Sequence, residues 1–309
     1  MGWSAADVVD QTGKVAVITG GNSGIGYQAA LMLCAAGAHV VIACRNERKG
    51  RMAASGVCNT MRDPSISTVT LDLADLASVR TCADKLHQAH DRIDMLINNA
   101  GVMAIPQRAT ADGFEMQLGT NHLGHFALTG LVLDLLQAAP AGRVVNVSST
   151  AHKFGTMDFD DLHSERKAYG AWQAYGQSKL ANLLFTYELQ RRLHAANSRA
   201  IGVACHPGYS ATNLQSVGPQ MTGSRVSGWF MSLGNRLVAQ SAHDGALPTV
   251  YAATHPDIVG GDYVGPDGMR EMWGPPRKTQ SNAASHDADS QQQLWQSSAS
   301  ATGVTYLSA

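Results

Sequence analysis

Val15-Ala16-Val17-Ile18-Thr19 runs directly into Gly20-Gly21-Asn22-Ser23-Gly24-Ile25-Gly26. The apolar, β-branched run predicts a strand that is buried on both faces. Apolar residues then recur at helical spacing from Ile25 to Ala36, and Gly37 is a typical helix-ending residue. A glycine-rich turn at a helix N-terminus offers backbone N–H groups and partial positive charge to an anion. The stretch therefore predicts a dinucleotide pyrophosphate site: Gly20 turns sharply, Gly24 admits the phosphates and Gly26 permits close helix packing.

Strand-like and helix-like segments alternate beyond this loop. The predicted strands cover 15–19, 40–43, 66–71, 95–97, 142–147 and 201–205, and the predicted helices cover 25–36, a segment opening at 45–51, 76–90, most of 114–136, and 174–195. Such alternation favours parallel pairing through right-handed crossovers. We expect an α/β fold: a single doubly wound Rossmann-type domain over residues 1–309, with a mostly parallel central sheet and helices on both faces.

Two segments fall outside this alternation. Residues 207–236 are rich in Gly, Ser and Met with weak periodicity, which is typical of a lid or substrate loop. Residues 279–309 are rich in Ser, Gln and Ala, and this composition suits a disordered tail. Alternatively, 279–309 is a partly helical extension, with a short helix over Asp287–Gln296 that Leu294 and Trp295 anchor.

Composition and charge exclude several classes of protein. Lys+Arg is 23 and Asp+Glu is 24, a balance that argues against a nucleic-acid partner. No apolar run reaches the roughly 18 residues of a membrane span. The N-terminus lacks a basic region followed by an apolar run, so no secretory signal is visible. Five scattered cysteines indicate reduced core thiols, and we expect a cytoplasmic protein.

A tyrosine and a lysine within the last predicted helix carry the chemistry. Tyr175 and Lys179 are four residues apart, so on a helix they share one face. A nearby ammonium favours the phenolate and is expected to lower the pKa of the tyrosine. The pair can then exchange a proton with the oxygen of a carbonyl or an alcohol. The same spacing also fits two surface residues of an amphipathic helix.

The choice of cofactor depends on the residues directly after the second predicted strand. An NAD-selective site normally places a carboxylate there to bond the ribose 2′-hydroxyl. This chain has Cys44 and Arg45 instead, with Arg48 and Lys49 close behind. A guanidinium can bind a 2′-phosphate through two N–H groups, so we expect NADP(H) in preference to NAD(H). The alternative is that these residues are solvated charges at a helix start.

Taken together, these motifs resemble the short-chain dehydrogenase/reductase family, whose signature T-G-x-x-x-G-x-G matches residues 19–26. Further family motifs follow in family order: Asn98-Asn99-Ala100-Gly101, Asn121, Ser148-Ser149, Tyr175 with Lys179, and Pro207-Gly208 with Thr212. The C-terminal part looks like the ends of retinol-dehydrogenase-like and WW-domain-oxidoreductase-like members, through Gly265-Pro266, Trp273-Gly274-Pro275, Leu294-Trp295 and Thr302-Gly303-Val304.

The resemblance implies a catalytic set of Asn121, Ser149, Tyr175 and Lys179. Ser149 would hold the substrate oxygen, with Ser148 as the competing candidate because strand alternation points the two in opposite directions. Asn121 would hold a water that relays protons to Lys179, or it satisfies backbone groups inside a helix. Lys179 would also bond the nicotinamide ribose.

The implied cofactor-binding set joins the glycine loop to the ends of later strands: Gly20, Asn22, Ser23, Gly24, Ile25, Gly26, Arg45, Asp72, Leu73, Asn99, Ala100, Gly101, Tyr175, Lys179, Pro207, Gly208 and Thr212. Asp72 would meet the adenine edge, while either Asp72 or Asp75 could instead cap the helix that begins near Leu76.

Two further features keep alternative interpretations. The long interval between Ser149 and Tyr175 resembles an insertion in retinol-dehydrogenase-like enzymes, and it either lies over the substrate pocket or forms a surface hairpin. His122 and His125 are three apart on a predicted helix, which could suit a metal. No third or fourth ligand is evident, so we predict packing roles and no metal site.

We therefore expect an NADP(H)-dependent oxidoreductase that interconverts an apolar aldehyde or ketone and its alcohol, acting as a homodimer or a monomer on a small-molecule substrate. A non-catalytic NADP(H)-binding redox sensor or scaffold is the main alternative. Activity like that of a nucleotide-sugar epimerase is a weaker alternative, since the loop spacing does not fit T-G-x-x-G-x-x-G. Activity like that of a protochlorophyllide reductase is another, but nothing in the sequence specifies a pigment pocket.

Overall fold

The computed structural model of the protein describes residues 2–209 and 240–307. Eight strands of this part form one sheet in the order β3-β2-β1-β4-β5-β6-β7-β8. All neighbouring pairs are parallel except β7 and β8. The strands are β1 (Val15–Thr19), β2 (His39–Cys44), β3 (Ile66–Thr70), β4 (Met95–Asn98), β5 (Arg143–Val147), β6 (Ile201–Cys205), β7 (Tyr263–Pro266) and β8 (Pro276–Thr279). The expected α/β class with a mostly parallel sheet is confirmed.

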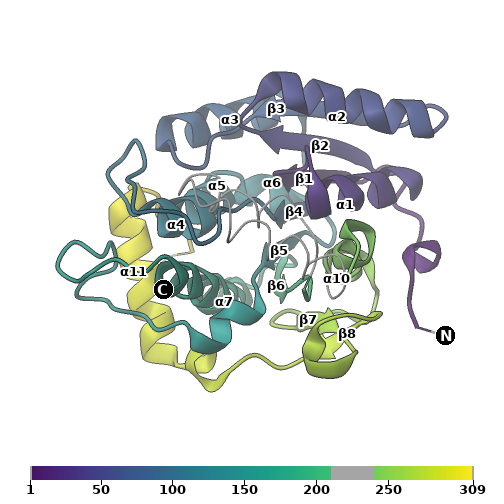
Figure 1. Ribbon diagram of the computed structural model, residues 1–309. Coiled ribbons are helices and arrows are strands. Elements are labelled where there is room, and N and C mark those ends of the chain that lie inside the picture. The colour runs from purple at the N-terminus through teal and green to yellow at the C-terminus, as the bar shows by residue number, and fades with distance from the viewer. Residues whose placement is uncertain (1, 210–239, 308–309) are drawn as a thin grey trace, which may run out of the picture.

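Strand side chains alternate between two apolar layers, because successive residues point to opposite faces. Ala16 and Ile18 belong to one buried cluster, and Val17 belongs to the other. Helices α1 (Gly24–Ala35), α2 (Glu47–Thr60) and α10 (Ala242–Thr254) cover the first face (Figure 1). Helices α3 (Leu76–Ala89), α5 (Gly124–Leu131), α6 (Leu133–Ala138) and α7 (Ala171–Ala195) cover the second.

The remaining helical pieces are short, except for the last helix. They are η1 (Ala5–Asp7), α4 (Met116–Leu118), η2 (Gly119–Leu123), η3 (Thr150–Phe154), η4 (Met269–Glu271) and η5 (Ala283–His286). Helix α11 (Ala288–Thr302) lies across the outside of α7, as Figure 1 shows in yellow against teal. Asp287 caps α11 by accepting a hydrogen bond from the Ser290 amide at 2.9 Å.

The region from 114 to 136 differs from the long, mostly helical segment that its apolar pattern predicts. It consists of α4, the π-helical η2, α5 and α6. Two glycines mark where the backbone must approach other chain segments closely. A Cβ on Gly119 would lie 2.5 Å from Thr110 Cγ2, and a Cβ on Gly124 would lie 2.5 Å from the Leu73 oxygen. These close approaches fix the position of the segment against Thr110 and Leu73, and the apolar periodicity of the sequence does not reveal them.

The strand order creates a crevice at one edge of the sheet. The chain leaves β1 toward β2 and β3 on one side, whereas β4 and β5 continue on the other side. The loops that follow β1 and β4 therefore diverge, and ligands of doubly wound sheets bind in such a gap. The glycine loop follows β1 and the Asn98–Gly101 segment follows β4, so both frame the same crevice.

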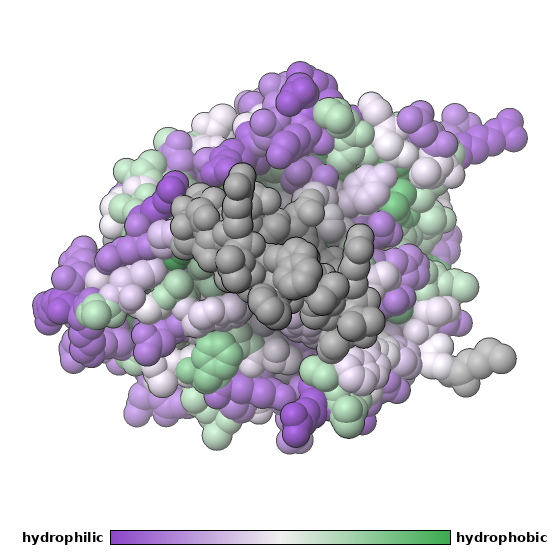
Figure 2. Space-filling view, viewed as in Figure 1, coloured by the Kyte–Doolittle hydropathy of each residue, from purple (hydrophilic) through white to green (hydrophobic). Residues whose placement is uncertain are grey.

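Most large apolar side chains of the described residues lie in the two layers. On the face shown in Figure 2, hydrophilic side chains cover much of the described surface, and hydrophobic ones are scattered among them. None of the described helices combines the length and the apolar character needed to cross a membrane.

Candidate active site

The glycine loop is held against the segment after β4 by Thr19. Its hydroxyl oxygen accepts hydrogen bonds from the amides of Asn99 at 2.9 Å and Ala100 at 3.0 Å. The Asn99 side-chain amide in turn donates to the Thr19 carbonyl at 2.9 Å. Gly20 adopts a φ of +67°, and a Cβ there would lie 3.0 Å from Ala100 Cα. The two loops thus form one rigid wall, and a residue larger than glycine would push them apart.

A cavity of about 610 Å³ opens beside this wall. It is lined by Gly20, Asn22, Ser23, Gly24, Ile25, Gly26, Asn99, Ala100, Gly101, Met103, Val147, Ser148, Ser149, Thr150, Ala151, Phe154, Trp172, Tyr175, Lys179, Pro207, Gly208 and Tyr209. The N-terminus of α1 is part of the lining, so its partial positive charge faces the cavity. A second cavity, beside Leu118 and Leu294, contains none of the predicted site residues.

Tyr175 and Lys179 share a face of α7 and both line the cavity. Lys179 Nζ lies 5.7 Å from the centroid of the Tyr175 ring and donates a hydrogen bond to the Val147 carbonyl at 3.1 Å. Burial lowers the pKa of Lys179 to about 8. The expected lowering of the tyrosine pKa is wrong for this structure. Burial raises the pKa of Tyr175 to about 12, although a hydrogen bond with Ser149 acts in the opposite direction.

The two candidate serines have different partners. Ser148 donates its hydroxyl hydrogen to the Lys179 carbonyl at 2.8 Å, which ties the end of β5 to α7. The Ser149 hydroxyl accepts a hydrogen bond from the Ala151 amide at 3.2 Å and is also a hydrogen-bond partner of Tyr175. The structure therefore places Ser149, and not Ser148, beside the tyrosine hydroxyl.

Asn121 lies in η2, behind the cavity lining. Its side-chain amide donates to the Val102 carbonyl and to Ser178 Oγ, both at 2.9 Å, and its Oδ1 accepts from the Val102 amide at 2.8 Å. The side chain is thus used to fix neighbouring groups, as in the alternative of an asparagine that satisfies backbone groups.

The predicted contacts to the adenosine end lie outside the cavity lining. Arg45 follows β2 with a side chain that is 77% exposed, and its Nη1 lies 3.9 Å from Asp72 Oδ2. Leu73 is buried against Gly124. Asp75, and not Asp72, caps α3, because it accepts hydrogen bonds from the amides of Ala77 and Ser78.

The loop after β6 and the long interval after Ser149 both reach the cavity. Pro207 and Gly208 line it, whereas Thr212 and most of the predicted 207–236 loop lie outside the described residues. Phe154 and Trp172 bring parts of the interval to the cavity, and Met157, Phe159 and Leu162 pack on α4 and α7 instead. The sequence did not point to Met103 or Val147 as lining residues, since neither lies in a recognisable motif, whereas Tyr209 belongs to the predicted 207–236 loop.

The two histidines on the central helix have packing roles. His125 Nε2 lies 2.9 Å from Thr19 Oγ1, and its Nδ1 lies 3.0 Å from the Asn121 carbonyl oxygen. His122 Nε2 contacts Ser298 Oγ of α11 at 2.7 Å. Burial lowers the pKa of His125 to about 4 and that of His122 to about 3, so both rings are neutral at pH 7. Across residues 2–209 and 240–307, no three His, Cys, Asp or Glu side chains gather closely enough to hold a metal ion.

Fold and site together describe a dinucleotide-dependent enzyme of the doubly wound class. The family model for short chain dehydrogenase matches residues 14–221, and the chain belongs to this family, in its retinol-dehydrogenase-like branch. Retinol dehydrogenase 13 of Mus musculus is 40% identical over 295 residues, covering 94% of this chain and 84% of that protein. Polyprenol dehydrogenase of Homo sapiens is 36% identical over 299 residues, covering 94% and 86% respectively.

A solved structure extends the match to nearly the whole chain. The crystal structure of an uncharacterised protein from Mycobacterium Paratuberculosis is 42% identical, covers 99% of both chains and superposes with a TM-score of 0.82. Membership of this family makes the protein an oxidoreductase that uses a nicotinamide cofactor and interconverts CH–OH and C=O groups.

Proposed function

We propose that the protein is an NADP(H)-dependent oxidoreductase that interconverts an apolar aldehyde or ketone and its alcohol, with Tyr175 as the acid and base. The observation that carries this proposal is the convergence of Ser149, Tyr175 and Lys179 on the cavity that the glycine loop also lines. Proton-transfer groups and a phosphate-binding loop in one cavity are what hydride transfer to a carbonyl requires.

The residues present fit a dinucleotide cofactor. Gly20 and Gly24 have φ values of +67° and +55°, a backbone conformation that glycine adopts readily because it has no Cβ. A Cβ on Gly26 would lie 2.5 Å from Asn99 Nδ2, so the space between α1 and the second loop admits glycine alone. Pyrophosphate would meet the backbone amides of residues 20–26, and Lys179 would hold the nicotinamide ribose. When bound, the nicotinamide supplies or accepts the hydride.

Burial suits Tyr175 to proton donation. With a pKa of about 12, the phenol stays protonated at neutral pH and can donate its proton to the oxygen of a carbonyl as that oxygen gains negative charge. Ser149, its hydrogen-bond partner, would hold the same oxygen. Lys179, with a pKa of about 8, remains mostly charged at pH 7 and favours that developing negative charge. In the oxidation direction Tyr175 must first lose its own proton, and the phenolate oxygen then accepts the hydroxyl proton of the alcohol.

The cavity lining supports an apolar substrate. Met103, Ala151, Phe154 and Trp172 contribute methyl, thioether and ring surface beside the serine and the tyrosine. The Trp172 ring lies edge-on to the Tyr175 ring at 6.1 Å between centroids. The names of the relatives, retinol dehydrogenase and polyprenol dehydrogenase, refer to alcohols with long apolar chains.

Turnover by the wild type and by Tyr175→Phe tests the chemistry. Purified protein would be assayed for NADPH and NADH oxidation against retinal, nonanal and a panel of other aldehydes and ketones. We expect Tyr175→Phe to lose about 10²–10⁴-fold in kcat, the usual worth of a positioned general acid, while it still binds NADPH. Equal turnover in the two proteins would contradict the role of Tyr175. Tight NADPH binding without turnover in the wild type would favour the sensor or scaffold alternative.

Arg45→Asp tests the choice of cofactor. The side chain is exposed after β2 and faces Asp72, and Cys44 and Arg45 place no carboxylate against a 2′-phosphate. We expect the Kd for NADPH to rise about 10–100-fold, the worth of charge-assisted hydrogen bonds, while that for NADH changes little. Isothermal titration with both cofactors would measure this, with Arg199→Asp, at an exposed position away from the site, as a control for net charge. An equal loss for both cofactors would argue against a contact with the 2′-phosphate.

A further inference from the structure

Glu271 is a mostly buried acidic residue that no family motif contains. It ends η4, between β7 and β8, and its side chain is only 15% exposed. Arg270 and Glu271 have φ values of +54° and +59°, a left-handed conformation that residues with a Cβ adopt at a cost in free energy. Such a backbone conformation persists only where surrounding contacts hold it, and the Glu271 side chain makes several of these contacts.

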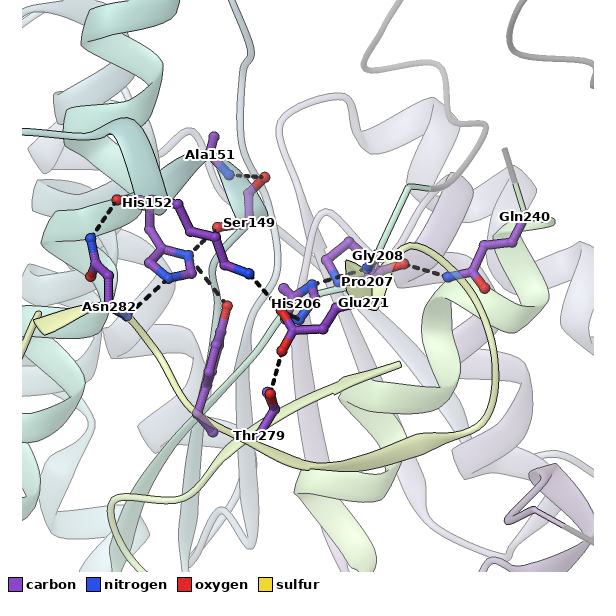
Figure 3. A network of polar contacts seen from close by, with 12 residues as sticks. Ser149, Ala151, His152, His206, Pro207, Gly208, Gln240, Glu271, Thr279 and Asn282 are labelled. Carbon is purple, nitrogen blue, oxygen red and sulfur yellow. Dashed lines mark hydrogen bonds and ion pairs between the residues drawn. The ribbon is translucent and has the colours of Figure 1, made fainter. Parts of the chain in front are cut away.

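Its carboxylate joins three segments of the chain (Figure 3). Oε2 accepts a hydrogen bond from Lys153 Nζ at 2.9 Å, and Oε1 accepts one from the Thr279 hydroxyl. Oε2 also lies 3.6 Å from His206 Nε2. Burial opposes ionisation of Glu271, but the hydrogen bonds from Thr279 and Lys153 and the positive charge of Lys153 outweigh it, so the pKa of Glu271 is lowered. The group is therefore a carboxylate at neutral pH.

His206 lies between the Glu271 carboxylate and the loop after β6. The ring is fully buried in a space that Gly265 leaves open, since a Cβ on Gly265 would lie 2.1 Å from His206 Nε2. Its Nδ1 accepts a hydrogen bond from the Gly208 amide at 3.2 Å. Burial lowers the pKa of His206, so the ring is neutral at pH 7. Because Nδ1 accepts a hydrogen bond, the single ring proton resides on Nε2, which lies 3.6 Å from Glu271 Oε2 and makes no hydrogen bond within the described residues.

Gly208 forms part of the cavity wall and packs closely against the segments around it. Its φ is +65°, and a Cβ there would lie 2.5 Å from the Met272 oxygen and 2.8 Å from Pro266 Cγ. The next amide, of Tyr209, donates to the same Met272 oxygen at 2.8 Å. The turn is thus clamped between His206 and the segment after Glu271.

The other arm of Glu271 reaches the opposite wall. Lys153 lies in η3, the single helical turn that starts directly after Ser149. The neighbouring His152 fixes the same turn (Figure 3). Its Nδ1 lies 2.6 Å from the Ser149 carbonyl oxygen, and the His152 carbonyl accepts a hydrogen bond from Asn282 Nδ2 at 3.1 Å. One carboxylate therefore connects the Ser149 wall to the Gly208 wall.

We propose that Glu271 is a positioning residue, which holds the Pro207–Gly208 turn through His206 and the Ser149 turn through Lys153. The inference rests on the proposed function, because the separation of these two walls matters for rate only if hydride passes between a cofactor and a substrate held there. A misplacement of reacting groups lowers kcat more than it lowers binding.

Glu271→Gln tests this directly, since glutamine keeps the size of the side chain and loses its charge. With NADPH and the best carbonyl of the panel, we expect kcat to fall about tenfold, while the Kd for NADPH changes less than about threefold. Glu165→Gln is the matched control, because Glu165 is exposed and its loss of charge is the same. A double-mutant cycle with His206→Asn should be strongly non-additive in kcat, as expected for two residues that act through one contact.

Hydrogen exchange gives a readout that does not need turnover. In Glu271→Gln, the amides of Gly208 and Tyr209 should exchange faster than in wild type, whereas those of β1 and α1 should not, and Tm should stay close to that of wild type. Unchanged exchange at Gly208 together with unchanged kcat would overturn the proposal. A global rise in exchange with a lower Tm would also overturn it, in favour of a purely structural role. If wild type turns over no carbonyl but Gly208 responds, the proposed function fails and the positioning contact stands.

Discussion

Burial acts in opposite directions on the two titratable groups of the site. It raises the pKa of Tyr175 to about 12 and lowers that of Lys179 to about 8, because removal from water disfavours the charged form of each. The phenol therefore keeps its proton, and the ammonium loses its proton more readily. For carbonyl reduction, Tyr175 is therefore a protonated acid at neutral pH, and Lys179 loses its positive charge as the pH rises above 8.

Lys179→Met should stabilise the protein while it abolishes turnover. The folded-state pKa of about 8 against the usual 10.5 means that burial of the ammonium costs roughly 3 kcal/mol at neutral pH. This cost is fully present below pH 8 and is relieved as pH rises toward 10.5, so the stability of wild type should increase across that window. The Val147 carbonyl keeps its hydrogen bond from Asn182, so the substitution leaves no orphaned acceptor.

We expect the free energy of unfolding at pH 7 to rise by about 1–3 kcal/mol in Lys179→Met, with a higher Tm. Urea unfolding at pH 7 and pH 10 would measure it, and the gain over wild type should be smaller at pH 10. Lys85→Met, at an exposed position on α3, is the control and should change little. A less stable Lys179→Met at pH 7 would show that the ammonium is not a net cost to the fold.

Several site residues could be predicted because their signals are local. The glycine loop, Ser149 and the Tyr175–Lys179 pair each lie within a few residues of the feature that identifies them. His125 and Glu271 act through partners far along the chain: His125 meets Thr19 across 106 positions, and Lys153 meets Glu271 across 118. No short pattern encodes such contacts. Spacing predicts the pKa of Tyr175 in the wrong direction because it reveals the nearby lysine but not the burial.

At the scale of elements, the contact between α1 and the segment after β4 sets the shape of the phosphate site. A Cβ on Gly26 would lie 2.5 Å from Asn99 Nδ2 and 2.6 Å from the Gly20 oxygen. The second of these atoms belongs to the backbone of the loop itself. Any side chain at position 26 must therefore separate α1 from the glycine loop, and this would displace the amides that face the cavity.

Gly26→Ala should thus weaken the cofactor site as well as the fold. We expect about tenfold weaker NADPH binding and a loss of about 1–3 kcal/mol in the free energy of unfolding, as for an overpacked core position. Gly56→Ala in α2 is a matched control: its Cβ would meet only the Tyr27 hydroxyl, at the movable end of a side chain, and alanine favours the helix. Titration calorimetry and urea unfolding would report both quantities. Unchanged NADPH affinity in Gly26→Ala would show that the close packing at Gly26 does not determine the geometry of the phosphate site.

At the scale of the whole molecule, α11 covers helices that would otherwise expose a large aromatic surface. The Trp295 ring lies 5.1 Å from the ring of Phe126 in α5 and 5.9 Å from that of Phe185 in α7. The guanidinium of Arg192 stacks over Trp295 at 4.5 Å and donates to the Leu307 carbonyl at 2.8 Å. The apolar stretches Leu123–Leu136 and Leu180–Leu193 thus contribute to the core beneath α11.

Because its own C-terminal helix occupies this surface, the full chain should be a monomer in solution. A chain that ends at His286 should expose Phe126 and Phe185, and exposed apolar surface of that kind drives association. We expect light scattering after gel filtration to give about 33 kDa for the full chain and larger species for the shortened one. Trp295→Ala, which keeps the helix and removes its largest contact, should cost about 3–5 kcal/mol in stability without association. A full chain that elutes as a dimer would mean that another surface pairs the subunits, and a soluble monomer after truncation would mean that α11 contributes little to covering α5 and α7.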